Sequence, residues 1–116
     1  MGNDRRLRRL TAGDTTWLWS VRHRHGDCRE ILSLHKEGAD TVLRIVFRAG
    51  AGRFVAEGAW YAGCVMTDHG DLLNLREPRV VRGLLEVARG HGALPVAPGE
   101  TELDGWLLLD APPGIG

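Results

Sequence analysis

The stretch that decides the fold alternates apolar and polar side chains, and it reads Thr15-Thr16-Trp17-Leu18-Trp19-Ser20-Val21-Arg22-His23-Arg24-His25. A period of two is typical of a β-strand with one buried face, because successive side chains point to opposite sides of a sheet. We therefore expect Trp17, Trp19 and Val21 in the core. The other face, toward water or a partner, is expected to carry Ser20, Arg22 and Arg24.

Similar patterns on both sides of this stretch predict further strands. Residues 28–35 are expected to pair with it through a hairpin at Gly26-Asp27. Residues 41–48 form the next predicted strand. Its inward side chains are Leu43, Ile45 and Phe47, and its outward side chains include Arg44 and Arg48. A short hairpin is expected over 64–75, and a last strand over 103–109.

One segment has the periodicity of an amphipathic helix. It begins at Pro78, a residue favoured in the first turn, and ends at Gly90 and Gly92. Four apolar residues recur at helical spacing on one side: Val81, Leu84, Leu85 and Ala88. The helix follows the strands instead of alternating with them. The predicted fold is therefore an α+β two-layer sandwich, in which one main helix covers a mainly antiparallel sheet of four to six strands.

The 116 residues are expected to form a single domain. A basic leader, residues 1–11, is predicted to be either a helical turn or disordered, and residues 110–116 form an irregular tail. The loop-rich segment 50–63 is expected to wrap the edge of the sheet.

Charge and composition exclude some classes of protein. The net charge is zero, but residues 1–58 hold 11 basic and 7 acidic side chains, against 4 and 8 in residues 59–116. The chain therefore has no global field for nucleic acid, although its halves are oppositely charged. Apolar runs are too short to cross a bilayer. Cys28 and Cys64 are expected to be free thiols in the cytoplasm.

A cluster of metal-ligand residue types surrounds the first predicted hairpin. His23 and His25 lie two apart on one strand, so their rings point to the same side at a spacing that suits one zinc ion. Cys28 follows the turn, and His35 ends the partner strand. Zinc is therefore a candidate cofactor. The alternative is that these are solvated polar residues beside a turn.

The outward arginines of the first and third strands predict a basic sheet face made of Arg22, Arg24, Arg44 and Arg48. Arg29 joins them if the second strand alternates in the same phase. The alternatives are a solvated face, a protein-binding face and a phosphate-binding face, of which the last lacks aromatic platforms among the charges. Trp60 and Tyr61, in a loop rich in small residues, are candidates for contact with a partner or for anchoring the loop in the core. We identify no catalytic motif.

The order of motifs resembles small bacterial proteins of GC-rich genomes that have no assigned chemistry. These motifs are Gly13-Asp14-Thr15-Thr16-Trp17-Leu18-Trp19, then Leu73-Asn74-Leu75-Arg76-Glu77-Pro78, then Asp104-Gly105-Trp106. The layout is also similar to that of immunity proteins of bacterial toxin systems. That resemblance implies a small, cofactor-free domain built on a sheet with one or two helices.

Three functions follow as hypotheses. The first is a non-enzymatic protein-interaction module, immunity-like or adaptor, that uses the arginine face and Trp60-Tyr61. The alternative is a metal-binding protein or small metal-dependent enzyme that uses the His/Cys hairpin. The second alternative is nucleic-acid binding through the arginine face, which predicts affinity that falls steeply with salt.

Overall fold

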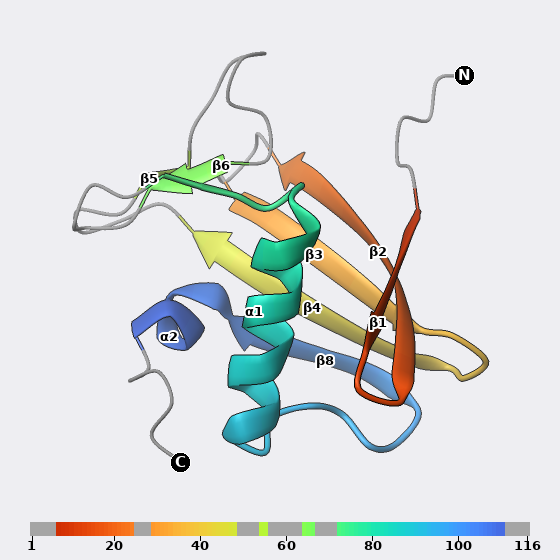
Figure 1. Cartoon of the computed structure of the whole chain (residues 1–116). Coiled ribbons are helices and arrows are strands. Elements are labelled where there is room, and N and C mark those ends of the chain that lie inside the picture. Colours follow the sequence, from red (N-terminus) through yellow and green to blue (C-terminus); the bar gives the residue numbers. More distant parts are fainter. Residues whose placement is uncertain (1–6, 25–28, 49–53, 56–63, 67–71, 111–116) are drawn as a thin grey trace.

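The computed structural model describes residues 7–24, 29–48, 54–55, 64–66 and 72–110. Its main element is a five-stranded sheet in the order β1-β2-β3-β4-β8 (Figure 1). The bounds are β1 Arg8–Ala12, β2 Thr15–Arg24, β3 Arg29–Lys36, β4 Thr41–Arg48 and β8 Gly99–Asp104. β1 to β4 pair antiparallel with one another, and β8 runs parallel to β4. The predicted strands over 15–25, 28–35 and 41–48 are confirmed within the described residues.

A second, smaller sheet contains β5 (Phe54–Val55), β6 (Cys64–Met66) and β7 (Leu72–Asn74) in that order. β6 and β7 pair antiparallel, with Cys64 opposite Asn74, which confirms the predicted hairpin. The rest of segment 50–63 lies outside the described residues, so its predicted course around the sheet edge stays a prediction.

The main helix, α1 (Pro78–Gly90), has the predicted bounds and the predicted buried side, formed by Val81, Leu84, Leu85 and Ala88. Proline in the first turn is compatible with the helix because the first backbone N–H groups have no intrahelical acceptor. At the other end Gly92 adopts φ +68°. This left-handed turn lets the Ala93 N–H reach the Ala88 carbonyl at 2.8 Å and ends the helix.

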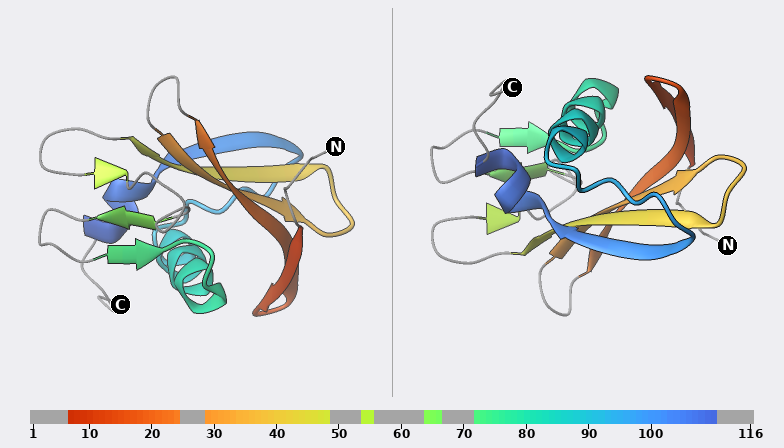
Figure 2. Two further views of the ribbon diagram at one scale, coloured as in Figure 1. Left: turned by 90° about the horizontal axis from the view of Figure 1, so that it is seen from above. Right: turned by 90° about the horizontal axis from the view of Figure 1, so that it is seen from below.

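The core lies between α1 and one face of the sheet. Figure 2 shows α1 and the short helix α2 (Gly105–Asp110) on the same side of the five strands. The sheet contributes alternate residues to this core, among them Trp17, Trp19, Leu34, Leu43 and Phe47, all at most 3% exposed. The predicted two-layer α+β sandwich is therefore confirmed. Among the described helices, none is long and apolar enough to cross a membrane.

The prediction for the leader is wrong over residues 8–11, which belong to β1. This strand pairs with the first half of β2, with Leu10 opposite Trp17. Leu10 is buried, and the Arg8 guanidinium lies 5.0 Å from the ring centroid of Trp19. Arg8 also donates to the Arg76 carbonyl at 2.7 Å. Burial of Leu10 and the stacking of Arg8 thus stabilise a short strand that has little apolar pattern of its own.

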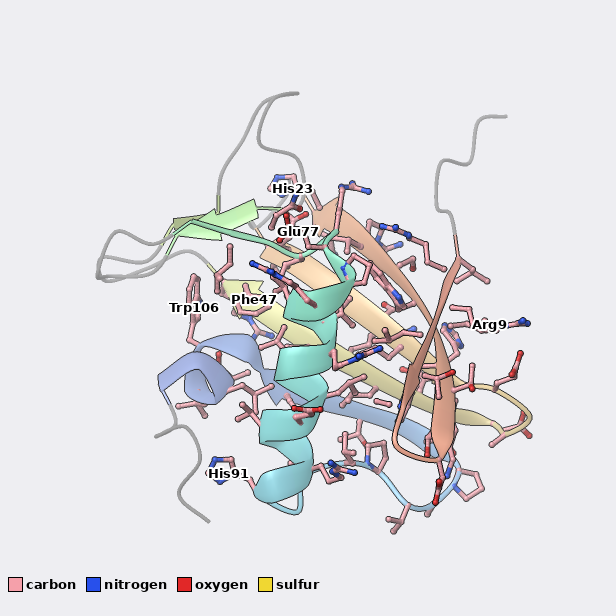
Figure 3. All side chains as sticks on the ribbon, viewed as in Figure 1. Arg9, His23, Phe47, Glu77, His91 and Trp106 are labelled. Atoms are coloured by element: carbon pink, nitrogen blue, oxygen red, sulfur yellow. The ribbon has the colours of Figure 1, made fainter. Side chains whose placement is uncertain are left out.

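The prediction of a strand over 103–109 is also wrong, because β8 ends at Asp104 and α2 follows at once. The Asp104 carboxylate accepts the Trp106 N–H at 2.9 Å and so caps the helix. The Trp106 ring meets Phe47 edge to face, with centroids 5.2 Å apart, and its indole N–H donates to the Arg48 carbonyl at 2.7 Å (Figure 3). Asp110 therefore ends a helix, and the remainder of the predicted tail lies outside the described residues.

Candidate interaction surface

The sheet face that points away from α1 and α2 is the open face of the molecule (Figure 2). Within the described ranges no helix packs over it. Strand alternation in the described strands places six arginines on this face: Arg9, Arg22, Arg24, Arg29, Arg44 and Arg48. The four arginines predicted to point outward do so, and Arg29 joins them because β3 alternates in the same phase.

Strand register brings three of these arginines into one line, the arginine row. Arg24 is directly opposite Arg29, and Arg29 is directly opposite Arg48. Opposite residues in antiparallel strands have Cα atoms about 4.5–5.5 Å apart, so the row spans roughly 10 Å. Like charges in such positions destabilise a sheet, by an amount of the order of 0.2–1 kcal/mol for each pair. The row therefore concentrates positive charge that groups of opposite charge must offset, as Glu102 does for Arg48.

Arg22 extends the arginine row along β2. It lies two residues from Arg24 on the same face, about 6.8 Å away along the strand. Arg22 and Arg24 are both exposed. We call the arginine row together with Arg22 the arginine cluster. Its guanidinium groups extend across three strands and along β2.

An acidic edge borders the open face on its other side. Glu100, Glu102 and Asp104 alternate along β8 on this face. Arg44 forms an ion pair with Glu100, and Arg48 with Glu102 at 2.9 Å. The open face is thus basic toward β2 and β3 and acidic along β8.

The neighbouring arginines change the pKa of the Glu102 carboxyl. The hydrogen bond from Arg48 is the main cause that holds the pKa of Glu102 below its ordinary value; desolvation opposes it, and the charges of Arg48, Arg29 and Arg44 lower the pKa further. Glu102 is therefore ionised at neutral pH. Its negative charge offsets that of Arg48, at the end of the arginine row next to β8.

Apolar side chains lie between the charged groups of the open face. Ile31 and Val46 are buried, 6% and 1% exposed, although they lie on the side of the sheet opposite the core. Leu18 and Val42 are half-buried on the same face. Because apolar side chains alternate here with arginines, the face has the mixed character of protein-interface surfaces.

His23, a predicted zinc ligand, lies on the core side of β2 instead of the open face. It faces Glu30 across the β2–β3 pair, and its Nδ1 is 2.8 Å from Oε1 of Glu30. Glu30 is 1% exposed and His23 side-chain exposure is 17%. Sequence reasoning missed Glu30, although it shares the inward phase of Leu32 and Leu34 on β3.

The register separates His35 from His23. His35 lies opposite Leu18, five residues from His23 along β2, a distance of about 17 Å. Among the described residues no three His, Cys, Asp or Glu side chains are gathered as metal ligands. His25 and Cys28 lie outside the described residues, so zinc binding at these two with His23 stays a prediction.

Trp60 and Tyr61, predicted to contact a partner, also lie outside the described residues. The site that the structure defines is therefore the open face with its arginine row. Comparison of the chain with protein-family models, with characterised proteins and with solved structures gives no match.

Proposed function

We propose that this protein is a non-enzymatic interaction module, of the immunity-like or adaptor kind, that binds an acidic surface of a protein partner on its open face. The observation that carries the proposal is the arginine row. Three arginines stand side by side on neighbouring strands and concentrate positive charge on the open face. A negatively charged partner would be attracted to this row, because each guanidinium offers a planar fork of donors to a carboxylate.

The surroundings of the row favour a protein partner over nucleic acid. The strip Glu100, Glu102 and Asp104 borders the same face and would repel a phosphate backbone that continued across it. The described strands place no Phe, Tyr or Trp on this face for bases to stack on. Leu18 and Val42 lie at the other end of the face, where Val42 is opposite Glu100 and two residues from Arg44, and they add apolar contact there, as protein interfaces do.

The proposal places the protein in the cytoplasm and includes Trp60 and Tyr61 as a second contact with the partner. Tryptophan, tyrosine and arginine are the residues most often responsible for binding energy at protein interfaces. A partner held by both regions would touch the open face and the loop at residues 60–61.

The test is affinity co-purification with two charge-reversal variants of equal charge. Arg22→Glu with Arg24→Glu alters the arginine cluster, and Arg79→Glu with Arg82→Glu is the control on exposed positions of α1. We expect one stoichiometric protein that survives nuclease treatment, is lost with the first variant and is kept with the second. Each arginine at the centre of such an interface is expected to contribute about 2 kcal/mol.

Two results would overturn the proposal. Recovery of nuclease-sensitive nucleic acid in place of a protein would favour the phosphate-binding alternative. Equal recovery of a protein by both variants would show that the arginine cluster does not bind it. Metal analysis of the same eluate tests the zinc prediction independently.

A further inference from the structure

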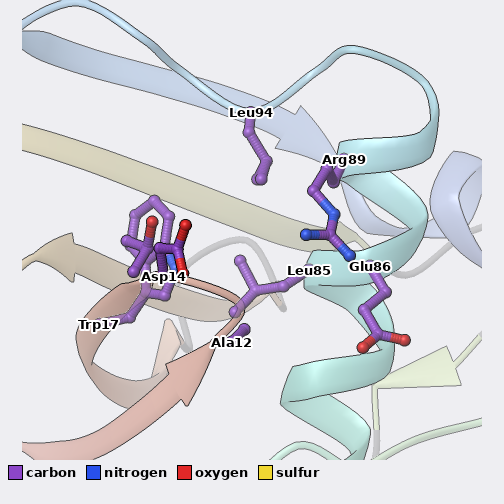
Figure 4. A pocket seen from close by; sticks show the side chains of 8 residues that line it. Ala12, Asp14, Trp17, Leu85, Glu86, Arg89 and Leu94 are labelled. Atoms are coloured by element: carbon purple, nitrogen blue, oxygen red, sulfur yellow. The ribbon is translucent and has the colours of Figure 1, made fainter.

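A pocket lies on the other side of the sheet from the open face, between the β1–β2 hairpin and the last turns of α1. Its volume is about 200 Å³. Sites for drug-sized ligands have volumes of roughly 300–1,000 Å³, so this pocket suits a much smaller molecule. Figure 4 shows Leu85 and Arg89 extending from α1 toward Asp14 and Trp17 of the hairpin.

The walls of the pocket divide into an apolar part and a charged part. Trp17 and Leu85, 3% and 2% exposed, form the apolar side together with the half-buried Leu94. Asp14, Glu86 and Arg89 are exposed at the rim. Within the described part of the chain, these three charged side chains form no ion pair with one another or with other residues.

The backbone of the hairpin leaves room for Arg89. Gly13 has φ +63°, a left-handed conformation that favours glycine, and a Cβ there would lie 3.2 Å from Nη1 of Arg89. The guanidinium therefore rests against the turn beside the pocket. A side chain at Gly13 would displace it.

The charges at the rim select among small ligands. Two carboxylates against one guanidinium make the site negative, and the C-terminal end of α1 adds a partial negative charge, so a simple anion is disfavoured. A simple cation would be repelled by the positive charge of the Arg89 guanidinium. A molecule with both an ammonium and a carboxylate can satisfy both kinds of group, because Arg89 can donate to its carboxylate while Asp14 and Glu86 attract its ammonium.

We propose that this pocket binds a small zwitterion, a free α-amino acid with a short apolar side chain. Its carboxylate lies on the Arg89 guanidinium and its ammonium lies beside the Asp14 carboxylate, with Glu86 attracting it at longer range. Its side chain packs on Trp17, Leu85 and Leu94. The site is independent of the open face, so the proposed function does not depend on it.

The test uses L-valine and two compounds that each lack one of its charged groups. Isovalerate lacks the ammonium, and isobutylamine lacks the carboxylate. Backbone amide signals of Ala12, Thr15, Leu85 and Leu94 are followed by NMR as each compound is added. We expect saturable shifts with valine, and affinity at least about tenfold weaker for both analogues, since each loses a charged contact.

Two variants locate the binding on the protein. Arg89→Gln should weaken valine binding by about tenfold or more, because a neutral amide replaces the charged donor. Arg79→Gln is the matched control, an exposed arginine on the same helix about 15 Å from Arg89. It should change the affinity by less than about twofold. Unchanged spectra at residues remote from the pocket show that both variants are folded.

Three results would overturn the proposal. These are the absence of saturable shifts at the pocket, equal binding of valine and either analogue, and equal loss of affinity in Arg89→Gln and Arg79→Gln.

Discussion

Replacement of Gly105 by alanine tests how tightly α2 packs against the sheet. Gly105 begins α2, and a Cβ at this position would lie 2.3–2.6 Å from three atoms of the Phe47 ring. Ordinary carbon contacts are about 3.5–4.0 Å. The ring cannot move away freely, because Phe47 is fully buried and Trp106 packs edge to face against it.

The expected cost follows from two opposing effects. Alanine is favoured over glycine in a helix by about 0.5–1 kcal/mol. Over-packing of a filled core costs about 1–3 kcal/mol, and contacts this close with three ring atoms place the cost in the upper half of that range. Gly105→Ala should therefore lower the free energy of unfolding by about 1–2.5 kcal/mol, which for a chain of this length corresponds to a fall in Tm of roughly 4–10 °C.

The assay is urea and thermal denaturation of two matched variants. Gly83→Ala is the control, since Gly83 lies within α1 and a Cβ there meets no heavy atom within 4 Å. This substitution should raise stability by about 0.5–1 kcal/mol. If Gly105→Ala is as stable as the wild type or as Gly83→Ala, that result contradicts the close packing of Gly105 against the Phe47 ring.

Three further predictions concern single side chains. Asp104→Ala should lower stability by about 1 kcal/mol in urea denaturation, because the Trp106 N–H loses its cap, while Asp104→Asn should keep most of it. Arg48→Gln should raise the pKa of Glu102 toward its ordinary value of 4.5, as an NMR titration of the carboxyl carbon would show; an unchanged pKa would contradict the assigned hydrogen bond. Since that pKa is lowered by folding, the exposed Arg48–Glu102 pair stabilises the protein above pH 4.5 and loses its effect as the pH falls through the folded pKa. Leu85→Ala should lower the free energy of unfolding by about 2–5 kcal/mol, because Leu85 is buried in the core, and a loss below about 1 kcal/mol would contradict that burial.

Much of the fold follows from periodicity that is visible in the sequence. The alternation of Trp17, Trp19 and Val21 and the spacing of Val81, Leu84 and Leu85 each match the geometry of the element that they form. Burial of one face is enough to specify such an element, because the period of a strand or helix decides which side chains share that face. The outward direction of the arginines follows from the same rule.

The elements that were missed, β1 and α2, carry little apolar periodicity of their own. β1 carries only one buried apolar residue, Leu10, and its pairing depends on Trp17 across the turn. α2 begins where Asp104 caps Trp106, whose ring packs on Phe47 from another strand. An alternating pattern does not indicate a strand with a single buried residue or a helix that begins at a cap, and the packing of Trp106 on Phe47 joins residues far apart in the sequence.

The candidate site shows the same division. The sequence by itself determined that Arg22, Arg24, Arg44 and Arg48 point away from the core, because strand alternation is a local property. Only the tertiary structure decided which arginines stand side by side, that β8 lies parallel to β4 with its carboxylates beside two of them, and that His35 lies far from His23. Register and strand order are set by how the whole sheet buries its apolar face against α1, and that depends on the complete chain.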